Sequence, residues 1–217
     1  MLSAEAAAWL GVIGFGVYHG LNPAMGWPLA VANGLAARRD SAVFATVWPL
    51  GLGHLLAMAV VLVPFALLAW YVEWSRAIRI GAALLVLAFG VLRLARPRHP
   101  RWLARVPPAR LAWWSFLMAT AHGAGLMLVP IALGLCARDA AQHSHVEVGS
   151  SVVTALLVAG VHTAAMMACG IALAWAVYRW LGLRFVTRSW FNLEAVWALS
   201  LMLTGGIAAA LAWTAPA

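Results

Sequence analysis

Six apolar runs, each long enough to cross a lipid bilayer, constrain the fold of this chain more than any other feature of its sequence. A membrane-spanning helix needs about 20 predominantly apolar residues. The runs that meet this length cover residues 4–34, 42–71, 77–95, 111–136, 151–178 and 190–213. Backbone polar groups inside a bilayer must bond within their own segment, and no run shows the alternating pattern of a membrane β-strand. The sequence therefore predicts an all-α integral membrane protein with six transmembrane helices.

The composition agrees with a membrane protein and excludes a soluble enzyme. Of 217 residues, 65% are hydrophobic and 9% are charged, whereas about a quarter are charged in ordinary soluble domains. The 14 basic residues are all arginine, and with 6 acidic residues they give a net charge of +8. These arginines lie between the apolar runs and form no basic face, so we expect lipid and no nucleic acid among the partners.

The arginines of the connecting segments predict the orientation in the membrane. One side receives the loops at 38–39, 93–110 and 179–188, which together hold 11 arginines, and the other side receives 3. Cytoplasmic loops carry the excess of positive charge in membrane proteins. We therefore expect a multi-pass protein of a bacterial-type inner (plasma) membrane with both termini outside, and an Arg-rich cytoplasmic linker at 96–110.

Histidine-centred patterns recur in the two halves of the chain. In the first and fourth runs a His-Gly pair, starting at His19 and at His122, is followed by Met and then by Pro three residues later. In the second and fifth runs His54 and His162 each precede a Met by four residues. The sequence therefore predicts two three-helix repeats, 1–95 and 111–217, and an odd number of helices makes the second repeat inverted.

The first apolar run carries a dense group of helix breakers. Two prolines and a glycine lie within the seven residues from Asn22 to Pro28. Proline removes a backbone donor and clashes with the preceding turn of a helix. Freed backbone groups at membrane depth persist only where they line a cavity or meet partners. We therefore expect the first helix to be broken at Asn22–Pro28, and a milder break in the fourth helix at Pro130. An ordinary proline kink is the alternative interpretation.

The side chains that carry chemistry within the runs are imidazoles and thioethers. Imidazole suits Cu, Zn, Ni and Co, and thioethers select softer ions such as Cu(I). Carboxylates are nearly absent from the runs, so an oxygen cage for Mg²⁺ or Ca²⁺ is not expected. Hydrogen bonds between helices are the alternative role for the histidines, and packing is the alternative for the methionines. The candidate metal ligands are His19, His54, His122, His162, Met25, Met58, Met127 and Met166.

Two further groups of polar residues are candidates for accessory roles. Glu194 near the start of the last run, together with Asn22 in the first, is a candidate for coupling transport to a proton or ion. His143, His145 and Glu147 in the predicted outer loop could capture a metal ion, and a solvated polar loop is the alternative interpretation.

The motif from Tyr18 to Ala24, His-Gly-Leu-Asn-Pro-Ala after the tyrosine, resembles the first-helix motif of the nickel/cobalt transporter family. Gly51-Leu-Gly-His54 is similar to the second-helix Gly-His element of that family. The family groups with the LysE and CcdA-type transporters, which are built from two inverted three-helix repeats. The resemblance implies a six-helix secondary transporter with a metal-type substrate. Asn22 stands where that family has an acidic residue, so the resemblance does not identify the metal.

These observations together predict a secondary transporter that moves a borderline or soft transition-metal cation of the Ni, Co, Cu or Zn type across the inner membrane. We expect no enzyme, no tightly bound cofactor, and a transition-metal ion as substrate. One alternative is a haem b protein that transfers electrons, because paired imidazoles can ligate haem iron. Another alternative is an exporter of small organic solutes. The direction of transport and the presence of a homo-oligomer stay open.

Overall fold

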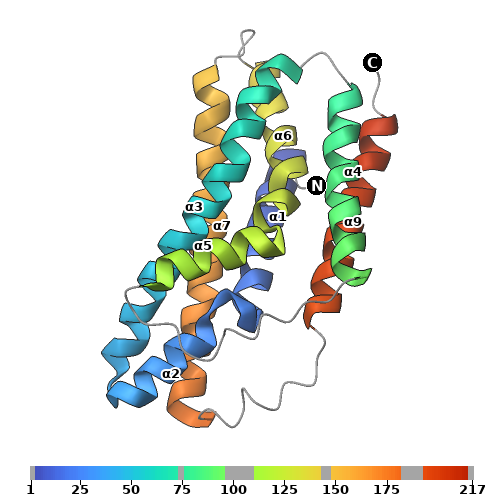
Figure 1. The fold of residues 1–217 in the computed structure, drawn as a ribbon. Helices are drawn as coiled ribbons and strands as arrows, with labels where there is room; N and C mark the ends of the chain where they lie inside the picture. The colour runs from blue at the N-terminus through green and yellow to red at the C-terminus, as the bar shows by residue number, and fades with distance from the viewer. Residues whose placement is uncertain (1–2, 73–75, 96–109, 143–147, 182–192, 215–217) are drawn as a thin grey trace. The chain divides into compact units, whose positions relative to one another are not determined.

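Every element that the structure describes is helical. The computed structural model describes residues 3–72, 76–95, 110–142, 148–181 and 193–214 (Figure 1). The elements in chain order are α1 (Ala4–Leu21), the 3-10 turn η1 (Pro23–Met25), α2 (Trp27–Ala37), α3 (Asp40–Val72), α4 (Arg76–Ala95), α5 (Leu111–His122), α6 (Ala124–Gln142), α7 (Val148–Ala176), the π-helical turn η4 (Val177–Leu181) and α9 (Leu193–Thr214). Each predicted apolar run corresponds to one helix or to a pair of consecutive helices.

Some of the described helices have the length and composition that a membrane protein requires. The segments Asp40–Leu68 and Ser151–Leu181 are each long and apolar enough to cross a bilayer, and α5 with α6 forms a third span if the bent pair is one crossing. The outward face of α3 is apolar, since Trp48, Leu52 and Leu56 follow at intervals of four residues and are between 50% and 73% exposed. The break in the first run leaves helices of 18 and 11 residues. Six crossings and two inverted repeats therefore stay predictions.

The described chain forms two compact units. The first unit comprises 1–58, 101–122 and 159–191, and the second comprises 59–100, 123–158 and 192–217. The long helices α3 and α7 each contribute one part to each unit. Both units therefore combine segments from the two predicted repeats.

The predicted break in the first helix is present, and local chemistry explains it. Helix α1 ends at Leu21, and the Asn22 side-chain oxygen accepts a hydrogen bond from the Ala24 backbone N–H (3.0 Å). Pro23 begins η1, and Gly26 then adopts a left-handed conformation at φ 101° before α2 begins at Trp27. A residue with a side chain rarely adopts this φ. The indole Nε1 of Trp27 donates to the Leu21 carbonyl (3.2 Å), which satisfies one of the acceptors that the break exposes.

The second interruption lies at Gly123, one position after α5, and not at Pro130. Gly123 has φ 72° and separates α5 from α6. Pro130 lies inside α6, which continues through it. The expectation of a break at Pro130 is therefore wrong. A left-handed residue redirects a chain more sharply than one lost hydrogen bond, which neighbouring groups in a helix can replace.

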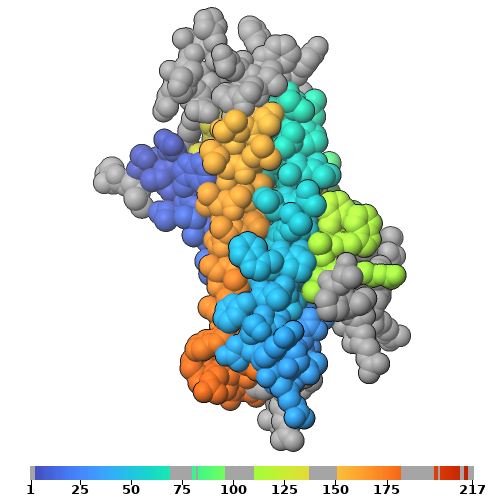
Figure 2. Space-filling model, turned by 90° about the vertical axis from the view of Figure 1, so that its left-hand side faces the viewer, coloured from blue at the N-terminus to red at the C-terminus, as the bar shows by residue number. Residues whose placement is uncertain are grey.

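Glycines allow the helices of the first unit to pack backbone against backbone. A Cβ added at Gly16 would lie 2.6 Å from the His162 carbonyl oxygen, and one added at Gly20 would lie 2.5 Å from that of Met166. The two glycines are one helical turn apart, which is the Gly-x-x-x-Gly spacing of close membrane-helix contacts. On α3, Gly53 lies against the Ala112 carbonyl of α5 in the same way. Within the first unit, Figure 2 shows the orange turns of α7 between α1 (dark blue) and the light blue part of α3.

In the second unit, glycines also allow close backbone contact between α4 and α9, which lie side by side (Figure 1). A Cβ at Gly90 of α4 would lie 2.9 Å from the Met202 backbone nitrogen. A Cβ at Gly205 of α9 would lie 2.6 Å from the Leu87 backbone nitrogen. Close helix contacts of this kind are therefore a property of both units.

Candidate functional site

Three of the four predicted histidine ligands meet in the first unit. His19 on α1, His54 on α3 and His162 on α7 are each at most 1% exposed. The ring centroids of His19 and His162 are 4.7 Å apart, and each lies 5.5 Å from that of His54. Three imidazoles from three helices, far apart in the sequence, thus form one buried cluster, which we call the imidazole cluster.

The glycine contact between α1 and α7 explains why two of these rings meet. Gly16 and Gly20 bring the backbone of α1 against the turns of α7 that begin at His162 and Met166. His19 lies between the two glycines in sequence, one residue before Gly20. The His162 ring then reaches the α1 backbone, where its Nδ1 lies 3.3 Å from the Val12 carbonyl oxygen.

The hydrogen bonds of two of the rings determine which ring nitrogen carries the proton. A carbonyl oxygen only accepts, so His162 Nδ1 carries the proton and donates to Val12. His19 Nδ1 donates to the Phe15 carbonyl in the same way (3.0 Å). In a neutral imidazole the other nitrogen, Nε2, then holds the lone pair. Metal-binding histidines in proteins are oriented by this kind of bond from the second ring nitrogen.

The polar atoms of His54 and His162 are incompletely satisfied. Both ring nitrogens of His54 and the Nε2 of His162 are buried and make no hydrogen bond. Leaving a buried polar group without a partner costs about 1–3 kcal/mol. Such groups in a native structure call for an explanation such as an ion or an ordered water. The imidazole cluster is therefore a candidate for a ligand with an affinity for nitrogen lone pairs.

The rings are close together but are not yet arranged around a common centre. Among the residues that the structure describes, no group of three or more His, Cys, Asp or Glu side chains is arranged to hold a metal ion. The His54 and His162 rings are stacked at 17°, and both stand edge-on to His19. Coordination of an ion by all three would therefore require the rings to turn about their side-chain bonds.

His122, the fourth candidate, lies in the same unit at the end of α5. It is 2% exposed, and its Nδ1 donates to the Met118 carbonyl (2.8 Å). Its tautomer is thus the same as that of His19 and His162. The α5 helix is held against α3 by the Ser115 hydroxyl, which donates to the Leu50 carbonyl (2.7 Å).

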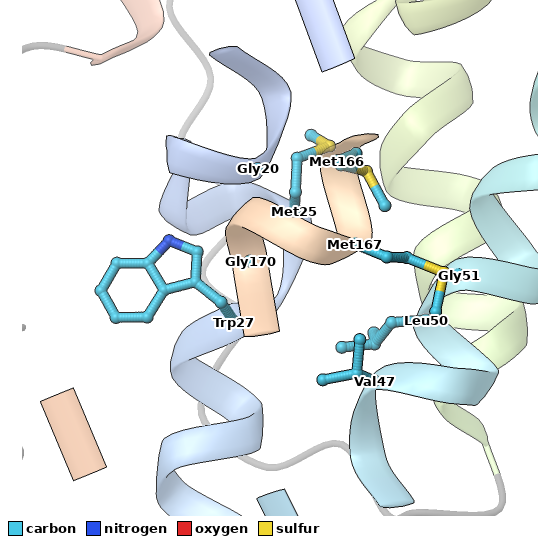
Figure 3. Close-up of a pocket in the computed structure, with 9 residues that line it drawn as sticks. All are labelled: Gly20, Met25, Trp27, Val47, Leu50, Gly51, Met166, Met167 and Gly170. Atoms are coloured by element: carbon cyan, nitrogen blue, oxygen red, sulfur yellow. The ribbon is translucent and has the colours of Figure 1, made fainter. Parts of the chain in front are cut away.

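The methionines divide between the two units. Met25 and Met166 line a small pocket of the first unit (Figure 3). Met58 follows His54 by one helical turn and is fully buried. Met127 is fully buried in the second unit, where its backbone N–H bonds the Gly123 carbonyl (3.2 Å).

Of the candidates for coupling and for metal capture, the structure describes the side chain of Asn22 alone. Asn22 is 6% exposed, and its side chain caps the start of η1 while its backbone N–H donates to the His19 carbonyl at the end of α1, which gives it a structural role. Glu194 lies in the first turn of α9, and its side chain is outside the description. The candidate capture residues His143, His145 and Glu147 lie outside the described residues.

Two features of the site are absent from the sequence-based prediction. Met167 lines the same pocket as Met166, although it does not belong to the histidine-methionine pattern. Gly16 and Gly20 bring α1 against α7, and their Gly-x-x-x-Gly spacing is the signal that could have predicted this contact.

Comparisons with protein-family models, with curated proteins and with solved structures found no match to this chain. The resemblance to the nickel/cobalt transporters therefore rests on the motifs quoted above. The function has to be argued from the chemistry of the imidazole cluster and its surroundings.

Proposed function

We propose that this protein is a secondary transporter that moves a borderline or soft transition-metal cation, of the Ni, Co, Cu or Zn type, across the inner membrane. The single observation that carries the proposal is the buried imidazole cluster, in which His54 has no hydrogen-bond partner for either ring nitrogen. Ionisable residues inside membrane helices are rare and mark substrate pathways. A metal ion would supply the missing partner for these lone pairs.

The broken first helix supports a transport role. The break begins at Asn22, three residues after His19. The η1 turn and Gly26 separate the 18-residue α1 from the 11-residue α2. Discontinuous helices next to a binding site are a recurring element of secondary transporters. We propose that α1 and α2 move relative to one another while the imidazole cluster passes the ion on.

The geometry of the cluster favours a bare cation over haem. The His19 and His162 ring centroids are 4.7 Å apart and the rings are edge to face. A haem held by two axial imidazoles lies between their rings, and rings in direct contact leave no room for a macrocycle. The pocket lined by Met166, one turn of α7 after His162, has a cavity volume of about 20 Å³, which is space for about one water-sized particle. A small ion therefore fits this pocket better than an organic solute does.

Metal binding by purified protein tests the proposal. We expect the protein to retain a transition metal after gel filtration, and to lose at least about 100-fold in affinity when His54 or His162 is changed to Ala. Thr163→Val is the matched control, because Thr163 is also buried, lies next to His162 and has a hydroxyl without a hydrogen bond. Its affinity should stay within about twofold of the wild type, since a hydroxyl is a poor ligand for soft ions.

Proteoliposomes loaded with a metal-sensitive dye extend the test to transport. The wild type should carry the bound metal across the vesicle membrane, and His54→Ala should not. Binding and transport that are equal in the wild type and in both histidine variants would contradict the proposal.

A further inference from the structure

Three thioethers line a single small pocket next to the break of the first helix (Figure 3). Met25 comes from η1, and Met166 and Met167 come from consecutive positions of α7. In Figure 3, Met25 extends from η1 toward Met166, while Met167 reaches toward Gly51 of α3. A Cβ added at Gly51 would overlap the Met167 sulfur, so the glycine makes the space that this sulfur occupies.

The rest of the pocket wall offers almost no competing ligand. Its other lining side chains among the described residues are aliphatic, apart from Trp27. The Trp27 Nε1 is engaged with the Leu21 carbonyl. Thioether sulfurs are polarisable, weak ligands that select Cu(I) and similar soft ions over hard ions. The pocket thus has the donor chemistry of a soft-metal site, in a volume of about 20 Å³ that admits one ion.

The charge of the surroundings restricts the ion further. Among the buried residues that the structure describes, the polar side chains are neutral, and none is Asp or Glu. The cost of burying an uncompensated ion rises steeply with its charge, and no side chain lining this pocket carries a negative charge that would offset a second positive charge. A monovalent soft cation is therefore the ion that this part of the protein accommodates at the lowest cost.

We propose that Met25, Met166 and Met167 form a thioether site for a soft monovalent cation, Cu(I) or its analogue Ag(I), that adjoins the imidazole cluster. The inference rests on the proposed transport function and names its substrate class. Met166 follows His162 by one turn of α7, so the two side chains lie on the same face of that helix. An ion on this face meets nitrogen ligands at one turn and sulfur ligands at the next.

Competitive titration with Cu(I) under anaerobic, reducing conditions tests the inference. The test variant replaces Met25, Met166 and Met167 by Leu together, a change that conserves volume and is tolerated in cores. Met202→Leu is the matched control, because Met202 lies in the second unit and packs against Gly90. A second variant, Gly51→Ala, leaves all three sulfurs in the chain and displaces Met167 alone. Zn(II) is titrated in parallel, since it binds imidazole well and thioether poorly.

We expect the triple variant to lose at least about 100-fold in Cu(I) affinity and Gly51→Ala about tenfold. Zn(II) affinity in both variants, and Cu(I) affinity in Met202→Leu, should stay within about threefold of the wild type. Ag(I) should compete with Cu(I) for the wild-type protein.

The outcomes separate the thioether site from the proposed function. Cu(I) affinity that is unchanged in the triple variant, while His54→Ala loses metal, would overturn the thioether site and leave the transporter in place. Cu(I) affinity that depends on the methionines while neither histidine variant affects any metal would support the thioether site and contradict the role of the imidazole cluster. A wild type that binds neither Cu(I) nor Zn(II) would overturn both.

Discussion

The two units of this protein are packed in the same way but bury different chemistry. Each unit brings helices together through glycines, at Gly16 and Gly20 in the first and at Gly90 and Gly205 in the second. All four of the buried histidines that the structure describes lie in the first unit. The described buried polar residues of the second unit are Ser151 and Thr154.

This difference shows which features of the chain are explained by packing and which are not. Small residues that allow close contact are the general means of joining helices in a membrane, where the lipid itself is apolar. The imidazole cluster adds buried nitrogen atoms without hydrogen bonds to the first unit, and these destabilise the fold unless a ligand satisfies them. Buried polar groups that lack a hydrogen bond, against the general pattern of protein interiors, are expected at functional sites.

The largest expected effect comes from filling the glycine contacts of either unit. Gly20→Val and Gly205→Val each place a side chain within 2.6 Å of neighbouring backbone atoms, and we expect each to destabilise the protein by about 3 kcal/mol. Only Gly20→Val should also abolish metal binding by the folded fraction, because it separates His19 from His162. Thermal unfolding in detergent, together with metal titration, measures both effects.

Gly14→Val and Gly206→Val are the matched controls, since an added Cβ has open space at both positions. Both should unfold within a few degrees of the wild type. If Gly205→Val removed metal binding as completely as Gly20→Val, the assignment of the site to the first unit would be wrong.

The second effect concerns the stability cost of the imidazole cluster. His54→Leu removes two buried nitrogen atoms that lack hydrogen bonds, so the metal-free variant should be more stable than the wild type by about 1–2 kcal/mol. The same variant should bind no metal at the cluster. Chemical unfolding of metal-free protein measures the gain, and a clear loss of stability would indicate that His54 has a structural role.

The third effect is the dependence of metal affinity on pH. Protons compete with metal ions for imidazole nitrogens, so affinity should fall as the pH is lowered and rise as it is raised. Each ring that must lose a proton adds a factor of at most about ten per pH unit. Zn(II) titrations from neutral to strongly acidic pH, where the neutral rings take up a proton, measure the slope. Affinity that rises toward acidic pH would exclude imidazole ligands.

The smallest expected effect comes from the polar cap at the break of the first helix. Asn22→Ala removes the side-chain oxygen that accepts from Ala24, at a cost of about 1 kcal/mol. Ser3→Ala removes an equivalent cap at the exposed start of α1, where Ser3 accepts from Ala6 (3.1 Å). The costs should be comparable, but only Asn22→Ala should weaken metal binding, because it loosens the turn that holds Met25. If Asn22→Ala and Ser3→Ala bound metal with equal affinity, the break in the first helix would have no role in metal binding.

The sequence is sufficient to predict the helices and the break in the first of them. Apolar length identifies the helices, and the local chemistry of Asn22, Pro23 and Gly26 determines the break, so neither depends on distant contacts. In the second half the sequence predicts a break at Pro130, whereas the helix is interrupted at Gly123. The left-handed conformation of Gly123, at φ 72°, depends on tertiary packing as well as on residue type. A single sequence therefore does not predict which glycine adopts it.

The sequence predicts which histidines belong to the candidate site but not which of their rings contact each other. The repeat pattern pairs His19 with His122 and His54 with His162, but the closest rings are those of His19 and His162. That contact depends on the crossing of α1 and α7 at Gly16 and Gly20. Residues that are 143 positions apart, 162 − 19, are brought together by packing that periodicity within one helix does not describe.

X-ray absorption spectroscopy at the edge of the metal that the purified protein retains tests the imidazole cluster most directly. We predict imidazole nitrogen scattering from the wild-type protein that weakens in His54→Leu and in His162→Leu but is unchanged in Thr163→Val. Bound metal without an imidazole signal, or an identical spectrum in the wild type and both histidine variants, would contradict the claim that these rings receive the ion.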